Sequence, residues 1–176
     1  MELPGTGYLF NLSVIATTFA GFAGLTVIFR EILGGKLTRL DGFVIRTFIQ
    51  LGFLAAFGSL LPPLFQLFEL PPAVIWRSAS IVMALLLGAW SFSFPRRRHA
   101  ASPTRVPAPI MCTVIVLDIA ALALVANAVW PASHYATGIY ATAVTVNLVG
   151  GATFFLFSLI FLFAKPLEPS TPAPQP

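Results

Sequence analysis

The chain has 176 residues, of which 57% are hydrophobic and only 9% are charged, and its mean hydropathy is +0.89. A soluble domain carries about a quarter charged residues, and a chain of this size cannot hide so much apolar surface in one core. The composition therefore excludes a water-soluble globule and predicts an integral membrane protein. Its net charge of +4 comes from Lys and Arg beside apolar segments. This placement favours the lipid bilayer and anionic lipid headgroups as partners, and disfavours nucleic acid.

Five apolar segments are each long enough to cross about 30 Å of hydrocarbon as a helix. We predict an all-α bundle of five transmembrane helices within residues 1–165, with spans at about 7–29, 43–68, 73–94, 109–130 and 135–163. Helices are required because an open sheet edge in lipid leaves backbone groups unpaired. The first segment has no basic region before it and is too long for a signal-peptide core, so we expect it to remain as a span.

Prolines and one capping pattern mark the predicted helix ends. Thr38, three residues before Asp41, resembles a capping box, which predicts that the second helix begins on the aqueous side of its apolar part. Pro62 and Pro63 indicate either a helix end or a kink. We favour the end, with residues 64–70 lying along the outer interface. The Pro-rich connection from Pro95 and the Pro-rich tail at 166–176 are both expected to be mobile.

The positions of Lys and Arg predict the orientation of the chain. Nearly all of them flank the first connection, the third connection or the last helix, and Arg77 alone lies near the opposite face. We therefore expect the N-terminus outside and the C-terminus, with the tail at 166–176, in the cytoplasm. A small polytopic protein of this kind is typical of the bacterial inner (plasma) membrane.

Asp118 is the main candidate for an ion or proton site. Counted from the cytoplasmic edge of the fourth span, it lies about 15 Å deep, at the middle of the bilayer. A charge there is costly, so the carboxylate should face a protein interior or a wet cavity. Asn147 on the fifth span reaches a similar depth and is predicted to be its neighbour. The alternative is structural: a protonated Asp118 that links two helices by one hydrogen bond.

Other polar side chains are weaker candidates. Those for a pathway or gate are Gln50, Thr17, Arg46 and Arg77. Arg46 and Arg77 lie close to a membrane edge, so they can also be anchors whose long stems reach water. A basic cluster in the third connection is predicted to contact anionic lipid headgroups, or to act only as a topology determinant; it comprises Arg96, Arg97 and Arg98.

Small residues recur along one face of the first and the last predicted helix. They are Ser13, Ala20, Gly21 and Gly24 in the first, and Gly150 and Gly151 in the last. Such faces let helices approach closely, so we predict that the first and fifth helices meet through them. In an oligomer, the same faces could instead line a narrow pore.

The sequence offers no sign of catalysis or of a cofactor. It has no clustered metal ligands, no phosphate-binding loop and no nucleophile elbow, and both histidines are predicted to lie in connections. The single cysteine, Cys112, is interpreted as a packed thiol. We therefore expect no metal, no cofactor and no enzymatic activity.

Two functions fit these observations. The first is a homo-oligomeric channel or transporter-like protein for a cation or proton, with Asp118 as its intramembrane site, because five helices are few to enclose a hydrated route. The second is a non-catalytic accessory or scaffold subunit of a larger membrane complex.

Overall fold

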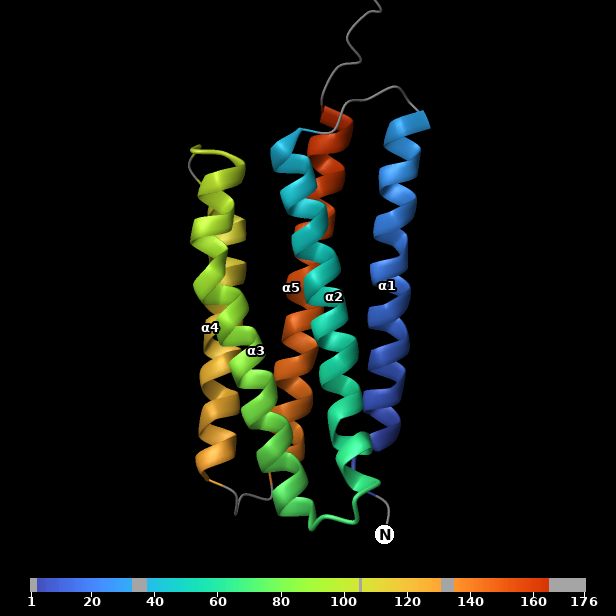
Figure 1. Cartoon of the computed structure of the whole chain (residues 1–176), viewed down its shortest axis with the longest axis vertical. Coiled ribbons are helices and arrows are strands. Elements are labelled where there is room, and N and C mark those ends of the chain that lie inside the picture. The colour runs from blue at the N-terminus through green and yellow to red at the C-terminus, as the bar shows by residue number, and fades with distance from the viewer. Residues whose placement is uncertain (1–2, 33–37, 105, 131–134, 165–176) are drawn as a thin grey trace, which may run out of the picture.

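The computed structural model describes residues 3–32, 38–104, 106–130 and 135–164, so the predicted tail at 166–176 lies outside the described residues. The described part is all-helical and contains no strand. Its helices are α1 (Thr6–Ile32), α2 (Arg39–Gln66), α3 (Pro72–Ala101), α4 (Ala108–Val129) and α5 (Ala136–Ala164), and they run side by side along the long axis of the molecule (Figure 1).

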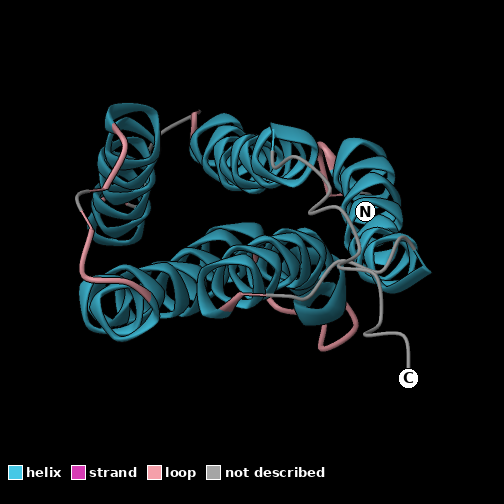
Figure 2. Ribbon diagram, turned by 90° about the horizontal axis from the view of Figure 1, so that it is seen from above, coloured by secondary structure: helices cyan, strands magenta, loops and turns pink. Residues whose placement is uncertain are grey.

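Four of the helices form a closed circle around one core. α2 packs on α3, α3 on α4, α4 on α5 and α5 on α2, and α1 packs on the outside of this circle, chiefly against α2. The view from above shows the resulting arrangement, with helices that are tilted relative to one another (Figure 2). Large side chains fill the centre of the circle, among them Leu51, Met83, Leu117 and Val144, which are all fully buried.

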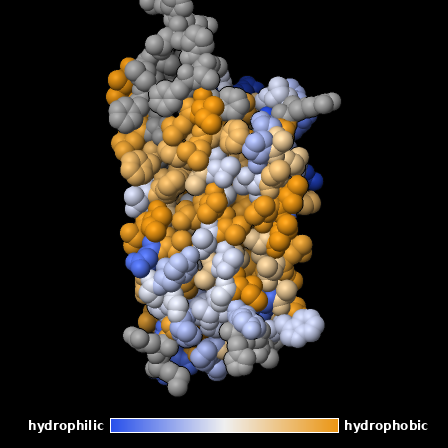
Figure 3. All heavy atoms as spheres, turned by 180° about the vertical axis from the view of Figure 1, so that it is seen from behind, coloured by the Kyte–Doolittle hydropathy of each residue, from blue (hydrophilic) through white to orange (hydrophobic). Residues whose placement is uncertain are grey.

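Among the described residues, four helices are long and apolar enough to cross a membrane: α2, α3, α4 and the part of α5 from Ala136 to Phe157. The outer surface agrees with this, because apolar side chains cover most of the face seen in Figure 3, with a band of nearly neutral side chains through its lower half. The structure thus supports the predicted integral membrane protein and its all-helical fold.

The predicted capping box at the start of α2 is confirmed. The Thr38 Oγ1 atom accepts a hydrogen bond from the Asp41 amide at 3.2 Å, and the Asp41 carboxylate accepts one from the Thr38 amide at 2.9 Å. Two amides at the helix start are therefore satisfied by side chains.

The predicted helix end at Pro62 and Pro63 is wrong, because α2 continues through both prolines to Gln66. Pro62 has no amide hydrogen for the carbonyl four residues earlier, which belongs to Gly58. The buried Tyr140 hydroxyl of α5 donates to that carbonyl at 2.6 Å. A side chain from a neighbouring helix thus replaces the lost helix bond, which explains why the helix can continue through the prolines.

The prediction that a mobile connection starts at Pro95 is also wrong, because α3 continues to Ala101. Arg98 is buried and stabilises the end of the helix. It donates to the Ser102 carbonyl at 2.6 Å and to the Thr104 hydroxyl at 3.2 Å. A basic side chain that bonds the last carbonyls is a common way to end a helix.

The glycines of α1 and α5 do not form the predicted contact between these two helices. An added side-chain carbon would meet nothing at Gly21 or Gly24. At Gly150 it would meet Leu117 of α4 at 3.1 Å, and at Gly151 it would meet Leu51 of α2 at 3.3 Å. Gly150 and Gly151 therefore allow α5 to approach α4 and α2.

Ala20 of α1 packs against α2. Ser13 and Ala20 are buried, and an added side-chain carbon at Gly52 of α2 would lie 3.2 Å from Ala20. α1 touches α5 through larger groups: the Tyr8 hydroxyl bonds the Thr145 hydroxyl at 2.7 Å, and the Phe19 and Phe155 rings pack edge to face.

Candidate intramembrane site

Asp118 lies on the outer surface of the bundle at the middle of α4. It is exposed, whereas the preceding Leu117 is fully buried in the core. The Ser91 hydroxyl of α3 donates a hydrogen bond to the Asp118 Oδ1 atom. Ten residues separate Asp118 from Ala108, which places it about 15 Å from that end of the helix. The carboxylate therefore lies on the outer surface at the middle of α4, exposed and bonded to a hydroxyl of α3.

Asn147 is not the neighbour of Asp118, so that prediction is wrong within one bundle. Its side chain is fully buried on α5, where the Nδ2 atom donates to the Leu51 carbonyl of α2 at 3.2 Å. Its Oδ1 atom has no hydrogen-bond partner among the described residues. Asn147 thus links α5 to α2 inside the core, while Asp118 lies outside it.

Arg97 forms a second polar site, between α2 and α3. Its guanidinium donates to the Gln50 Oε1 atom at 2.5 Å and to the Trp90 carbonyl at 3.2 Å, and it lies 5.8 Å from the centre of the Trp90 ring. Trp90 is seven residues before Arg97, so the side chain turns back along α3, away from the end of the helix at Ala101.

The Arg97 guanidinium lies in a groove of about 610 Å³ between these two helices. Apolar side chains form most of its walls, and the polar groups come from Gln50, Ser93 and Arg97. Among the described residues, both hydrogen bonds of the guanidinium end on neutral oxygens, and the charged group that acts on it electrostatically is another cation, Arg46. The Nε atom of Arg97 and the Nε1 atom of Trp90 are buried without a hydrogen-bond partner in the described part of the chain. The groove therefore carries positive charge and unused donors.

The three consecutive arginines point in different directions and do not form one basic cluster. Arg96 is exposed and lies 5.3 Å from the centre of the Phe92 ring. Arg97 turns into the groove, and Arg98 is buried against the end of its own helix. The predicted contact with lipid headgroups therefore fits Arg96 and is at odds with the placement of Arg98.

The remaining pathway candidates lie apart from Asp118. The Thr17 hydroxyl donates to the Ser13 carbonyl of its own helix at 2.9 Å, and Thr17 lies on α1, outside the four-helix circle. Arg77 is exposed in the first turns of α3, at the opposite end from Arg97, and Arg46 is exposed on α2. Gln50 differs from these candidates because its side chain contacts another polar side chain, that of Arg97.

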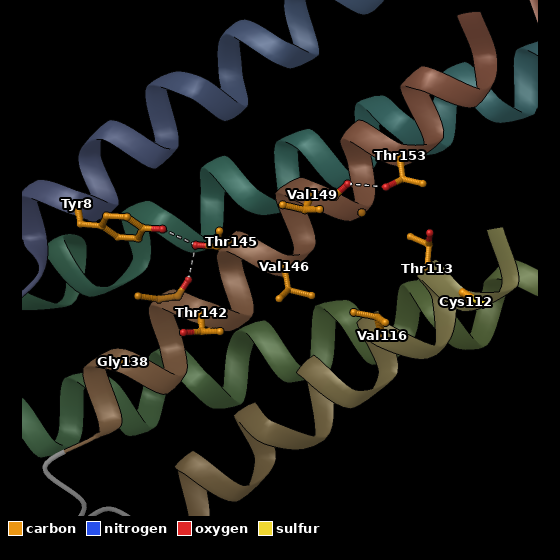
Figure 4. Close-up of a pocket in the computed structure, with 12 residues that line it drawn as sticks. Tyr8, Cys112, Thr113, Val116, Gly138, Thr142, Thr145, Val146, Val149 and Thr153 are labelled. Carbon is orange, nitrogen blue, oxygen red and sulfur yellow. Dashed lines mark hydrogen bonds between the residues drawn. The ribbon is translucent and has the colours of Figure 1, made fainter. Parts of the chain in front are cut away.

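A further groove of about 570 Å³ runs between α4 and α5 and is lined by threonines, Tyr8 and Cys112 (Figure 4). Several of its hydroxyls are already used inside the chain. Thr145 donates to the Ala141 carbonyl at 2.7 Å, Thr153 to the Val149 carbonyl at 3.0 Å and Thr113 to the Pro109 carbonyl at 2.9 Å. This groove thus presents mainly apolar side chains and hydroxyls that are already bonded.

Sequence reasoning missed Ser91 and the inward direction of Arg97. A signal for Ser91 was present, because it lies ten residues before the end of α3 and Asp118 lies ten residues after the start of α4. In an antiparallel pair with a short connection, such residues lie at the same depth. No local pattern indicates which way a long arginine side chain turns.

The described residues contain no group of three or more His, Cys, Asp or Glu side chains that could hold a metal ion. No family model matches the sequence, and no curated protein or solved structure matches it either. The interpretation of the site therefore depends on its geometry.

Proposed function

We propose that the chain crosses the membrane five times, with the N-terminus outside and the C-terminus in the cytoplasm, as in a bacterial inner membrane. In support, the N-terminal end of α2, with Arg39, and the C-terminal end of α3, with Arg96, lie at the same end of the bundle, and Arg77 lies toward the other (Figure 1). Basic residues concentrate on the cytoplasmic side of membrane proteins. α1 has 27 residues, which is also enough to span the hydrocarbon.

We propose that the protein is a non-catalytic membrane subunit that associates with other copies of itself through the outer face of α3 and α4. The observation that carries this proposal is the position of Asp118: mid-helix, exposed, and bonded within its own chain through Ser91. A charged aspartate at the bilayer centre costs about 2.5 to 3.5 kcal/mol on insertion scales. Contact with a second protein surface removes the carboxylate from lipid and lowers this cost.

The exposure of α4 supports the same proposal. In the most apolar stretch of α4, 28% of the residues are buried within the bundle, compared with 61% for α2. A helix that one bundle leaves so uncovered, and that carries a carboxylate on its open side, is suited to contact another helix in the membrane.

A channel or transporter-like protein for a cation or proton is the second candidate, because a carboxylate bonded to a hydroxyl can hold a proton or a cation. Large apolar side chains close the centre of one bundle, including Leu51, Leu87 and Leu124. A conducting path therefore has to run between copies, with Asp118 and Ser91 on its wall. This candidate requires the same homo-oligomer and, in addition, the passage of protons or cations between its copies.

The test measures self-association in lipid vesicles by energy transfer between copies fused to donor and acceptor fluorophores. Interhelical polar contacts contribute about 1 to 2 kcal/mol in membranes, so Asp118→Leu should weaken association about tenfold. Glu69→Gln is the matched control, because Glu69 is an exposed acid in the turn after α2. It should leave association unchanged.

An Asp118→Leu protein that associates like the wild type, or a wild type without energy transfer at any density, contradicts the proposed self-association. Flux of protons or potassium through the same vesicles separates the two candidates. Flux that Asp118→Leu abolishes favours the channel, and association without flux favours the non-conducting subunit.

A further inference from the structure

Two opposite charges lie at the same depth on neighbouring faces of the bundle. The Asp118 carboxylate accepts a bond from Ser91 on the α4 side of α3. The Arg97 guanidinium donates to the Trp90 carbonyl and to Gln50 on the α2 side of α3. Ser91 and Trp90 are consecutive residues, and one residue of helix corresponds to a rise of about 1.5 Å. The two charged groups therefore share one level in the bilayer but lie on different faces.

In the described part of the chain, both groups are hydrogen-bonded to neutral partners and neither is paired with a charge of opposite sign. The acceptors of Arg97 are neutral, Arg46 acts on it as a like charge, and its buried Nε atom has no partner among the described residues. Asp118 is hydrogen-bonded to a neutral hydroxyl, that of Ser91. An arginine and an aspartate inside a membrane are most stable when they pair with each other or with another charge.

We propose that Asp118 of one copy binds in the α2–α3 groove of the next copy and pairs with its Arg97. This inference rests on the proposed self-association and names the surface that receives Asp118. The groove has room for such an insertion, with a volume of about 610 Å³ and walls formed by Phe53, Phe57 and Leu86. The apolar neighbours of Asp118 on α4, Ile115 and Leu122, are exposed and can pack against these walls.

The depth of the groove favours a carboxylate from a second copy over a lipid phosphate. The acceptor carbonyl of Arg97 belongs to Trp90, which is eleven residues from the end of α3 at Ala101, or about 16 Å along the helix. Lipid phosphates lie outside the hydrocarbon layer, which is about 30 Å thick. A carboxylate at the level of Ser91 lies at the same depth as the Arg97 guanidinium. Neither copy therefore has to shift along the membrane normal for the two groups to pair.

The contact joins two different faces of the same chain, so it is head-to-tail. Such contacts close into a ring when the rotation between copies permits and otherwise continue as an open array. Because both charges lie at one depth, a rotation about the membrane normal is sufficient to bring them together. A flat ring in the membrane is the assembly that this geometry favours.

The experiment joins the two positions by a disulfide between differently tagged copies in native membranes. Cys112, which is exposed, is first replaced by alanine. One copy carries Asp118→Cys and the other carries Arg97→Cys, and a membrane-permeant oxidant is added. We expect a cross-linked product that contains both tags. With Arg77→Cys in place of Arg97→Cys, this product should be at least tenfold less abundant.

Charge exchange keeps the inference testable if the cysteine variants fold poorly. Asp118→Arg alone and Arg97→Asp alone should each weaken energy transfer between copies at least tenfold, because each places like charges in contact. The double variant restores opposite charges across the contact, and its association should return to within about threefold of wild type. Arg96→Gln, on the same helix, should have no effect.

The outcomes separate this inference from the proposed function. If Asp118→Leu weakens association but Arg97→Gln does not, self-association stands and the pairing with Arg97 is refuted. If Arg97→Gln instead only reduces the anionic lipid that co-purifies with the protein, the groove binds a lipid and the inference is wrong. If neither variant changes association, the proposed function fails as well.

Discussion

The polar groups inside the bundle and those on its α3 and α4 surface differ in how they are bonded. Inside, Tyr140 donates to Gly58, and Asn127 donates to the Ser80 hydroxyl at 2.9 Å and to the Ala136 carbonyl at 3.1 Å. On the surface, Asp118 is bonded to one serine and Arg97 to neutral oxygens. The comparison separates groups that stabilise one bundle from charged groups for which the described residues supply no counter-charge.

The largest effect is expected where α5 packs against α2. Gly151→Leu should destabilise the bundle by about 3 kcal/mol, because its side chain would collide with Leu51, whose Cβ atom lies 3.3 Å from the first added carbon. Unfolding in mixed micelles, followed by tryptophan fluorescence, measures this. Gly21→Leu is the control, since an added carbon there meets nothing within 4 Å. Equal stability of the two variants would show that Gly151 does not pack closely against Leu51.

Removing one internal hydrogen bond should have the next largest effect. Tyr140→Phe leaves the Gly58 carbonyl without the donor that replaces the missing amide of Pro62, so the free energy of unfolding should fall by about 2 kcal/mol. Tyr135→Phe changes an exposed tyrosine and should be neutral. If Tyr140→Phe is as stable as the wild type, the interior bond does not hold α2 across its prolines.

The end of α3 should be less sensitive. Arg98→Gln loses the bonds to Ser102 and Thr104, and we expect a loss of about 1 kcal/mol. Hydrogen exchange should rise at Ala100 and Ala101 and remain unchanged in α2. Arg96→Gln, next to it, should alter neither quantity. Unchanged exchange in the Arg98 variant would exclude a role for this side chain in ending the helix.

The smallest effect on a single bundle is expected at Asp118. Asp118→Asn can still accept the Ser91 bond, so the unfolding free energy of detergent-dispersed monomers should change by about 0.6 kcal/mol or less. A loss comparable to that of Tyr140→Phe would place Asp118 among the groups that stabilise the bundle itself, and the contrast between interior and surface would no longer hold.

Local sequence patterns predicted much of the fold but little of the site. Thr38 and Asp41 are neighbours in the chain, so their capping box could be read directly, and the depth of Asp118 followed from counting along an apolar segment. The continuation of α2 depends on Tyr140, which is far away in sequence, so Pro62 alone could not distinguish a kink from an end. Counting along the apolar segments predicts a similar depth for Asn147 and Asp118, but only the rotation of each helix decides that one faces Leu51 and the other is exposed.

The central claim is that Asp118 lies at a contact between copies of this chain. Its most direct test is the number of subunits in single particles of the wild-type protein extracted with surrounding native lipid, counted by stepwise photobleaching of one fluorophore per copy. The account predicts several bleaching steps per particle, and fewer for Asp118→Leu at the same membrane density. A single step in wild-type particles, with the same distribution for the variant, would contradict it.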